Sequence, residues 1–112
     1  TRITIVSDLP KRVEDYFILD VRDEEEYDSK HIEGSHNIPH RMILVVEYPG
    51  SIGHALKKIP KDKTILMFCS TGKRARLAEK VLSKRGYDVF NIMSFEHAED
   101  FINSLKVINK NE

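Results

Sequence analysis

The chain has 112 residues, and its 18 lysines and arginines balance 18 aspartates and glutamates, so the formal net charge is zero. This length suits one domain with a single core, and the balanced charge gives no general affinity for nucleic acid or an anionic membrane. Apolar runs such as Met42 to Val46 are far too short to span a bilayer. The single cysteine excludes an internal disulfide, so we expect a cytoplasmic protein with a free thiol.

The beginning of the chain predicts two strands separated by a brief helix. Ile3 to Val6 is the first strand candidate. Ser7 is placed to cap a helix that runs through Val13, with Pro10 in its first turn, where the missing N–H is tolerated. Phe17 to Val21 follows as a buried strand, because four of its five residues are apolar.

An acidic run follows that strand. Asp23 and Glu26 have the spacing of a capping box, in which each side chain accepts the other residue's backbone N–H. Glu24 and Glu25 suit the positive end of a helix dipole. The run therefore predicts a solvated helix start in preference to a metal site.

The middle of the chain contains a loop, an ambiguous apolar run and a further helix. His31 to Pro39 predicts a loop that leads into a short extended piece, and its two histidines lack the partners of a metal site. Met42 to Val46 fits a helix or a strand, and Pro49-Gly50 ends it. Ser51 is expected to cap a helix with one apolar face, which consists of Ile52, Ala55, Leu56 and Ile59.

The last part of the chain alternates strands and helices. Thr64 to Phe68 predicts a buried strand, and a helix from Ala75 ends at Gly86, a suitable left-handed cap. Tyr87 to Ile92 predicts another strand, and Ser94 starts a last helix. The apolar residues at helical spacing are Leu77, Ala78, Val81 and Leu82, then Ala98, Phe101, Ile102, Leu105 and Ile108. This alternation predicts an α/β fold with a mainly parallel central sheet flanked by helices on both faces.

The only cysteine lies where a strand, a tight loop and a helix meet. In open α/β sheets ligands bind at the carboxyl ends of the strands, and a helix N-terminus adds unpaired N–H groups and partial positive charge. The loop N–H groups, together with Lys73, Arg74 and Arg76, favour the anionic form of a thiol in this place. A structural cysteine needs neither a glycine three residues on nor two adjacent cations, so Cys69 is the candidate nucleophile.

Three stretches together resemble the rhodanese-like domain: Leu19 to Arg22 with Tyr27, His31 to Pro39, and Cys69 to Arg74 followed by Gly86 to Val89. In order and spacing they cover most of the chain, and they look like the single-domain thiosulfate sulfurtransferases, whose active loop has the form Cys-x-x-Gly-x-Arg. The resemblance implies a parallel sheet of about five short strands and a cysteine that carries a persulfide. We expect neither a cofactor nor a metal, because the chain offers no cluster of ligands at metal-binding spacing.

The sequence departs from the family's pattern outside the loop. Lys30 stands where the family commonly has glycine, Met93-Ser94 replaces the usual glycine pair after the last strand, and the final helix lacks a tryptophan. The segment from His40 to Gly53 is longer than in the compact members. These departures concern the surface that faces the acceptor, whereas the loop itself keeps the family's form.

The resemblance implies a two-step transfer of sulfur. The Cys69 thiolate attacks the outer sulfur of a small anionic donor such as thiosulfate, and the persulfide then passes that sulfur to a thiol, cyanide or protein acceptor. We expect the backbone N–H groups of Ser70 to Arg74 to hold the anionic sulfur, while Gly72 lets the loop curl around it.

The loop side chains have less specific expected roles. Arg74, with its planar fork, suits the donor's oxyanion end better than Lys73, which is either a second donor contact or a solvated surface charge. The Ser70 and Thr71 hydroxyls bond either the bound species or the loop itself.

Asp20 and Arg22 are expected near the same edge of the sheet. Strand-end charges usually need partners, so structural ion pairing is the preferred role for both over catalysis.

Two other classes of function fit parts of the sequence. A phosphatase or arsenate reductase also uses a Cys-to-Arg loop over a helix N-terminus. The tyrosine-phosphatase pattern has five residues between Cys and Arg, whereas this chain has four, and a smaller loop suits one sulfur atom better than a phosphate.

A rhodanese-like binding or regulatory module is the non-enzymatic alternative. Such modules commonly lose the cysteine that this chain keeps. The sequence fits sulfur delivery between proteins as well as it fits turnover of free thiosulfate.

Overall fold

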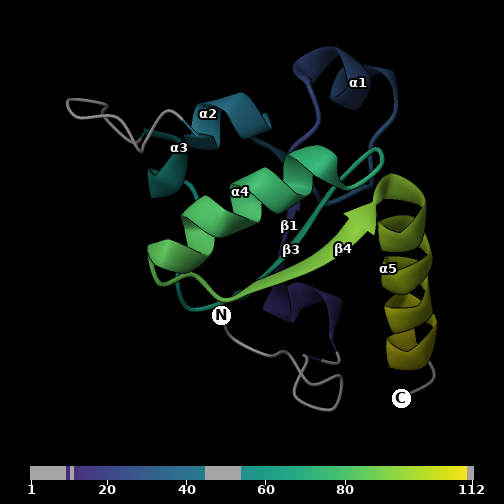
Figure 1. The fold of residues 1–112 in the computed structure, drawn as a ribbon. Helices are drawn as coiled ribbons and strands as arrows, with labels where there is room; N and C mark the ends of the chain where they lie inside the picture. Colours follow the sequence, from purple (N-terminus) through teal and green to yellow (C-terminus); the bar gives the residue numbers. More distant parts are fainter. Residues whose placement is uncertain (1–9, 11, 45–53, 111–112) are drawn as a thin grey trace.

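The computed structural model describes residues 10, 12–44 and 54–110, and within them a parallel sheet forms the centre of the molecule (Figure 1). Its four strands are β1 (Tyr16–Asp20), β2 (His36–Asn37), β3 (Thr64–Cys69) and β4 (Val89–Ser94), in the order β2-β1-β3-β4. Every pairing is parallel. The predicted α/β fold is confirmed, while the strand expected at Ile3 to Val6 and the helix start at Ser7 lie outside the described residues.

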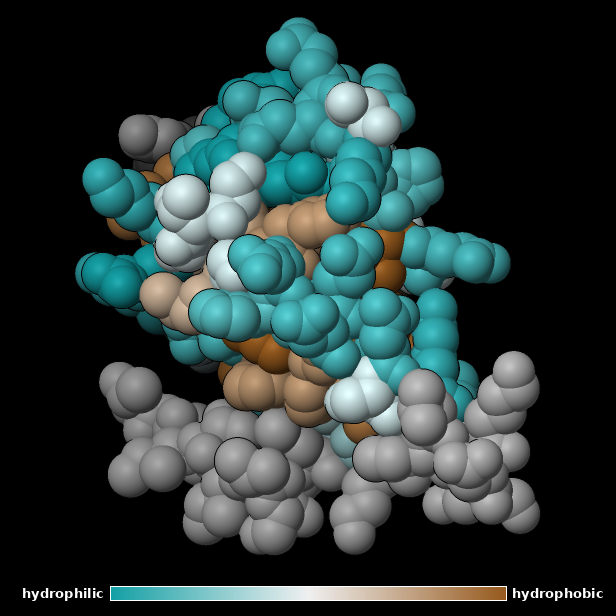
Figure 2. All heavy atoms as spheres, turned by 90° about the vertical axis from the view of Figure 1, so that its right-hand side faces the viewer, coloured by the Kyte–Doolittle hydropathy of each residue, from teal (hydrophilic) through white to brown (hydrophobic). Residues whose placement is uncertain are grey.

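Helices pack on both faces of the sheet, as Figure 1 shows for α4 and α5. One face carries α4 (Lys73–Lys84) and α2 (His40–Leu44), and the other carries α5 (Phe95–Lys110). The remaining helical elements are the 3-10 helix η2 (Val13–Asp15), α1 (Glu24–Ser29) and α3 (His54–Lys57). Among the described residues no helix is long and apolar enough to cross a membrane. Figure 2 shows mostly hydrophilic side chains on the side that carries α5, with hydrophobic residues visible between them.

Strand alternation divides the core into two layers. In β3 the side chains of Ile65, Met67 and Cys69 pack on the α4 side, whereas Leu66 and Phe68 pack on the α5 side. This is the two-residue period of a strand that is buried on both faces. Because Cys69 is two residues after Met67, its thiol lies on the same face as Met67, which α4 covers. Cys69 is also the last residue of the strand.

The helix boundaries confirm some sequence predictions and correct others. The apolar run that begins at Met42 belongs to helix α2 as far as Leu44, and the rest of the run lies outside the described residues, as does the expected cap Ser51. Helix α4 begins two residues before the expected Ala75. Leu77 is 46% exposed, because the buried face of α4 runs through Ala75, Ala78, Val81 and Leu82.

Glycine and capping signals were accurate at the other helix ends. Asp23 and Glu26 form the predicted capping box at the start of α1. Gly86 has a φ of +88° after the end of α4, which is the left-handed conformation that favours glycine. Ser94 Oγ accepts the His97 N–H at the start of α5. Strand β4 is shifted along the chain, to Val89–Ser94, because its pairing with β3 begins at Val89.

Candidate active site

Cys69 is the last residue of β3, and its side chain is fully buried. The sulfur accepts two backbone N–H groups from the start of α4: that of Gly72 at 2.9 Å and that of Ala75 at 3.4 Å. The helix cap, Gly72, has no side chain to satisfy the first N–H groups, and the thiol takes this role. N–H groups that converge at the positive end of a helix stabilise an anion, so this position suits a sulfur that carries negative charge.

Gly72 gives the loop its shape. Its φ is +107°, which residues with a Cβ rarely adopt, and this conformation turns the chain from β3 into α4 within three residues. Of the loop N–H groups that the sequence suggested, from Ser70 to Arg74, that of Gly72 reaches the sulfur. The Ala75 N–H was not predicted. Ala75 is the third residue of α4, and the first N–H groups of a helix have no partner within the helix. Knowing that the helix begins at Lys73 would therefore have identified this donor.

Arg74 is held by a carboxylate from another part of the chain. Its Nη1 donates to Glu26 Oε1 at 2.5 Å and its Nη2 to Glu26 Oε2 at 3.1 Å. Ser70 completes the network, since its hydroxyl donates to Glu26 Oε2 at 2.8 Å and accepts from Arg74 Nη2 at 3.0 Å. The loop is therefore fixed to the first turn of α1 by a charge-assisted network.

This network shifts the protonation equilibria of both charged partners. The hydrogen bond from Arg74 is the main cause that lowers the pKa of Glu26, from 4.5 to about 2. The hydrogen bond to Glu26 in turn raises the pKa of Arg74. Both shifts favour the ionised forms, so the charged brace of the loop is present near neutral pH.

The other loop side chains face solvent. Thr71 and Lys73 are both exposed. In the part of the chain that the structure describes, Lys73 has no ion pair. A cation without a partner at the start of α4 remains available to an anion that approaches the loop.

Asp20 and Arg22 form a buried ion pair at the end of β1. Arg22 Nη2 donates to Asp20 Oδ2 at 2.8 Å, and Arg22 Nε contacts both carboxylate oxygens at 3.0 Å. The same guanidinium donates to the Lys30 carbonyl at 2.6 Å and stacks 4.4 Å from the centre of the Phe95 ring. These contacts tie three segments together, and the geometry is that of a structural pair.

His40 begins α2 close to the loop network. Its Nδ1 is buried and has no hydrogen-bond partner among the described residues. Burial above all, and then the charge of Arg74, lower the pKa of His40. The imidazole is therefore neutral at pH 7 and adds no positive charge to the loop.

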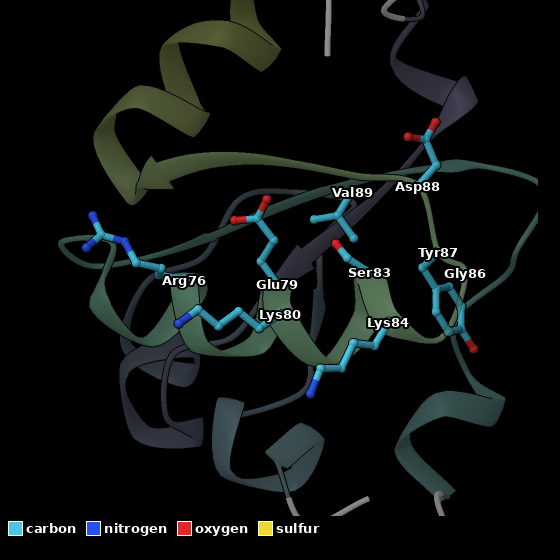
Figure 3. A pocket seen from close by; sticks show the side chains of 9 residues that line it. All are labelled: Arg76, Glu79, Lys80, Ser83, Lys84, Gly86, Tyr87, Asp88 and Val89. Atoms are coloured by element: carbon cyan, nitrogen blue, oxygen red, sulfur yellow. The ribbon is translucent and has the colours of Figure 1, made fainter. Parts of the chain in front are cut away.

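A groove lies away from the thiol. It has a volume of about 740 Å³ and runs between α4 and the start of β4. Figure 3 shows the side chains that line it: Arg76, Glu79, Lys80, Ser83, Lys84, Gly86, Tyr87, Asp88 and Val89. None of them belongs to the segment from Cys69 to Arg74. In the described part of the chain, no group of three or more histidine, cysteine, aspartate or glutamate side chains is arranged to hold a metal ion.

The sequence profile of the rhodanese-like domain matches residues 6–95. The chain belongs to the rhodanese-like family. Among curated proteins, this rhodanese-like chain is 31% identical to the thiosulfate sulfurtransferase PspE of Escherichia coli over 85 residues, which are 76% of this chain and 74% of PspE. It is 34% identical over 76 residues to the thiosulfate:glutathione sulfurtransferase of Saccharomyces cerevisiae.

Other relatives are longer than this rhodanese-like chain. The probable adenylyltransferase/sulfurtransferase MoeZ of Mycobacterium tuberculosis is 36% identical over 70 residues, or 62% of this chain. The chain spans only 16% of the length of MoeZ and 53% of the length of the yeast protein.

Solved structures share the fold. A rhodanese-like domain protein of Staphylococcus aureus superposes with a TM-score of 0.60 at 25% identity, over 75% of this chain and 74% of that one. A rhodanese with anions from E. coli gives a TM-score of 0.57 at 26% identity, over 73% of this chain and 89% of that one.

Proposed function

We propose that this rhodanese-like chain is a sulfurtransferase that carries sulfane sulfur on Cys69 as a persulfide. In the first step the Cys69 thiolate attacks the outer sulfur of thiosulfate, and a new S–S bond forms. The S–S bond of the donor breaks, and sulfite leaves with the electron pair. In the second step an acceptor attacks the outer sulfur of the persulfide, and the thiolate of Cys69 is restored.

The observation that carries this proposal is the pair of N–H groups that converge on the Cys69 sulfur. Gly72 and Ala75 donate to it at 2.9 and 3.4 Å, at the positive end of α4. These donors favour the anionic nucleophile of the first step and the anionic leaving thiolate of the second. Because they belong to a loop fixed by Arg74 and Glu26, they need no reorganisation during the reaction.

The donor is proposed to be a small anion such as thiosulfate, and the acceptor a thiol, cyanide or a protein. The names of the E. coli and yeast relatives, a thiosulfate sulfurtransferase and a thiosulfate:glutathione sulfurtransferase, support this class of reaction. Exposed Lys73 is proposed to attract the oxyanion end of the donor, while Arg74, which is bonded to Glu26 and Ser70, holds the loop. A thiol that must stay reduced fits a reducing compartment such as the cytoplasm.

The proposal is tested by weighing the intact protein after incubation with thiosulfate and then measuring thiocyanate after cyanide is added. We expect the wild type to gain one sulfur atom and to lose it to cyanide, and Cys69→Ser to do neither. Full thiocyanate production by Cys69→Ser would overturn the mechanism. Failure of the wild type to gain sulfur would also overturn it, as would hydrolysis of an aryl phosphate that depends on Cys69.

A further inference from the structure

Met93 has a backbone conformation that its side chain disfavours. Its φ is +78°, and it is the only residue other than glycine with a positive φ in the described part of the chain. The pairing of β3 with β4 shifts here by one residue, since Met67 pairs with Asn91 but Phe68 pairs with Met93. This is a β-bulge, and a glycine would adopt the same φ without strain.

The bulge is held in place by side-chain hydrogen bonds. Asn91 Oδ1 accepts the Met93 N–H at 2.8 Å, and Asn91 Nδ2 donates to Glu79 Oε1 on α4 at 3.0 Å. A strained conformation persists only where surrounding contacts enforce it, and these two contacts do so. The backbone conformation of Met93, and with it the direction in which its side chain leaves the strand, is therefore held by these contacts.

That side chain lies against the loop that holds the sulfur. A Cβ built on Gly72 would be 2.8 Å from Met93 Cε and 3.6 Å from Met93 Sδ, so the thioether end of Met93 contacts Gly72. Gly72 is the residue whose N–H donates to the Cys69 sulfur. Cys69 itself pairs with Ser94, the residue that follows Met93, and has no exposed surface.

We propose that Met93 narrows the approach to Cys69 and thereby limits the sulfur acceptor to small or slender nucleophiles. This inference rests on the proposed sulfur transfer. The lone pair of the acceptor must reach the outer sulfur of the persulfide, where it forms a new bond. The S–S bond to Cys69 then breaks, and its electron pair stays on the Cys69 thiolate. A small nucleophile such as cyanide or hydrosulfide needs little displacement of the methionine side chain, whereas a bulky thiol such as glutathione needs that chain to move further. An unbranched, flexible thioether is able to move, so the restriction is one of rate.

The experiment compares the wild type with Met93→Gly in two measurements. The first is alkylation of Cys69 by iodoacetamide and by a bulky fluorescein maleimide, followed by intact mass. The second starts from persulfide-loaded protein and measures single-turnover discharge to cyanide and to glutathione. Met93→Gly is expected to fold, because glycine is unstrained at this φ.

We expect Met93→Gly to raise the maleimide rate several-fold with little change for iodoacetamide, and to raise glutathione discharge relative to cyanide. Met93→Leu keeps the bulk without the sulfur and should retain the wild-type ratios. Met42→Ala changes an exposed methionine on α2 and serves as the matched control. Equal ratios in the wild type and Met93→Gly would overturn the inference. If no persulfide forms, the alkylation ratio still decides it, because alkylation does not require sulfur transfer.

Discussion

Glu26→Gln removes the charge that joins α1 to the loop around Cys69 while it preserves the shape of the side chain. The Glu26 carboxylate accepts hydrogen bonds from Arg74, from the Ser70 hydroxyl and from the Asp23 N–H. The first of these is the main reason why the pKa of Glu26 falls from 4.5 to about 2. The variant therefore measures what the ionised network contributes to the free energy of unfolding.

The size of the effect follows from the two pKa values. Each pH unit between 4.5 and about 2 corresponds to about 1.36 kcal/mol, so the upper limit is about 3.4 kcal/mol. The Glu26 side chain is 36% exposed, and solvent screens a pair of this kind. We expect Glu26→Gln to lower the free energy of unfolding by roughly 1–2 kcal/mol at pH 7.

The pH dependence has a defined sign. The pKa of Glu26 is lower in the folded state than in the unfolded state, so its stabilising contribution is fully present above about pH 4.5. That contribution is lost as the pH falls towards about 2. The difference between the wild type and Glu26→Gln should shrink over the same interval, because acid removes the same charge that the substitution removes.

Urea unfolding followed by circular dichroism, from pH 7 down to the lowest pH at which both proteins fold, measures this difference. Glu25→Gln is the control, because Glu25 is exposed in the same first turn of α1 and accepts no side-chain hydrogen bond in the described part of the structure. Equal stability of Glu26→Gln and Glu25→Gln at pH 7 would refute the reasoning. So would a difference that stays constant as the pH falls.

Two further predictions concern the buried pair and the loop. Asp20→Asn removes the negative charge that is paired with buried Arg22, and we expect it to lower the free energy of unfolding, measured in urea, by about 3–5 kcal/mol; a loss below about 1 kcal/mol would contradict the role of the pair. Gly72→Ala should cost about 1–3 kcal/mol and slow persulfide formation, because its φ is +107° and its Cβ meets Met93. Gly86 has a similar φ of +88°, but a Cβ added there would meet no atom within 4 Å. Gly86→Ala should therefore lower stability without slowing persulfide formation, which intact mass measures over time. Equal effects of both glycine variants on that rate would show that the contact with Met93 does not matter.

Local patterns in the sequence predicted the parts of the site that neighbouring residues determine. The apolar run before Cys69, the glycine at position 72 and the helical spacing after it were enough to place the thiol between strand and helix. The capping box at Asp23 and Glu26 and the left-handed Gly86 were also predicted, because each depends on a few adjacent residues.

Contacts between distant residues were not predictable in this way. The spacing around Arg74 suggested an oxyanion contact and gave no sign of Glu26, which precedes it by 48 residues. Glu26 was interpreted only as a helix-capping residue, and its second role depends on how α1 packs against the loop. The sequence marked Met93 as unusual, since glycine is common there. Its positive φ and its contact with Gly72 come from a register shift between β3 and β4, which no local pattern specifies.

The double role of Glu26 also has a consequence for folding. One carboxylate closes the local capping box of α1 and braces the loop through Arg74, 48 residues away, so the brace is complete only when both segments have met. A loop of this length closes late, since its entropy must be lost before the contact forms. A partly folded chain therefore presents Cys69 in a loop that Glu26 does not yet brace. The rate at which Cys69 reacts with a sulfur donor should accordingly report how far folding has been completed.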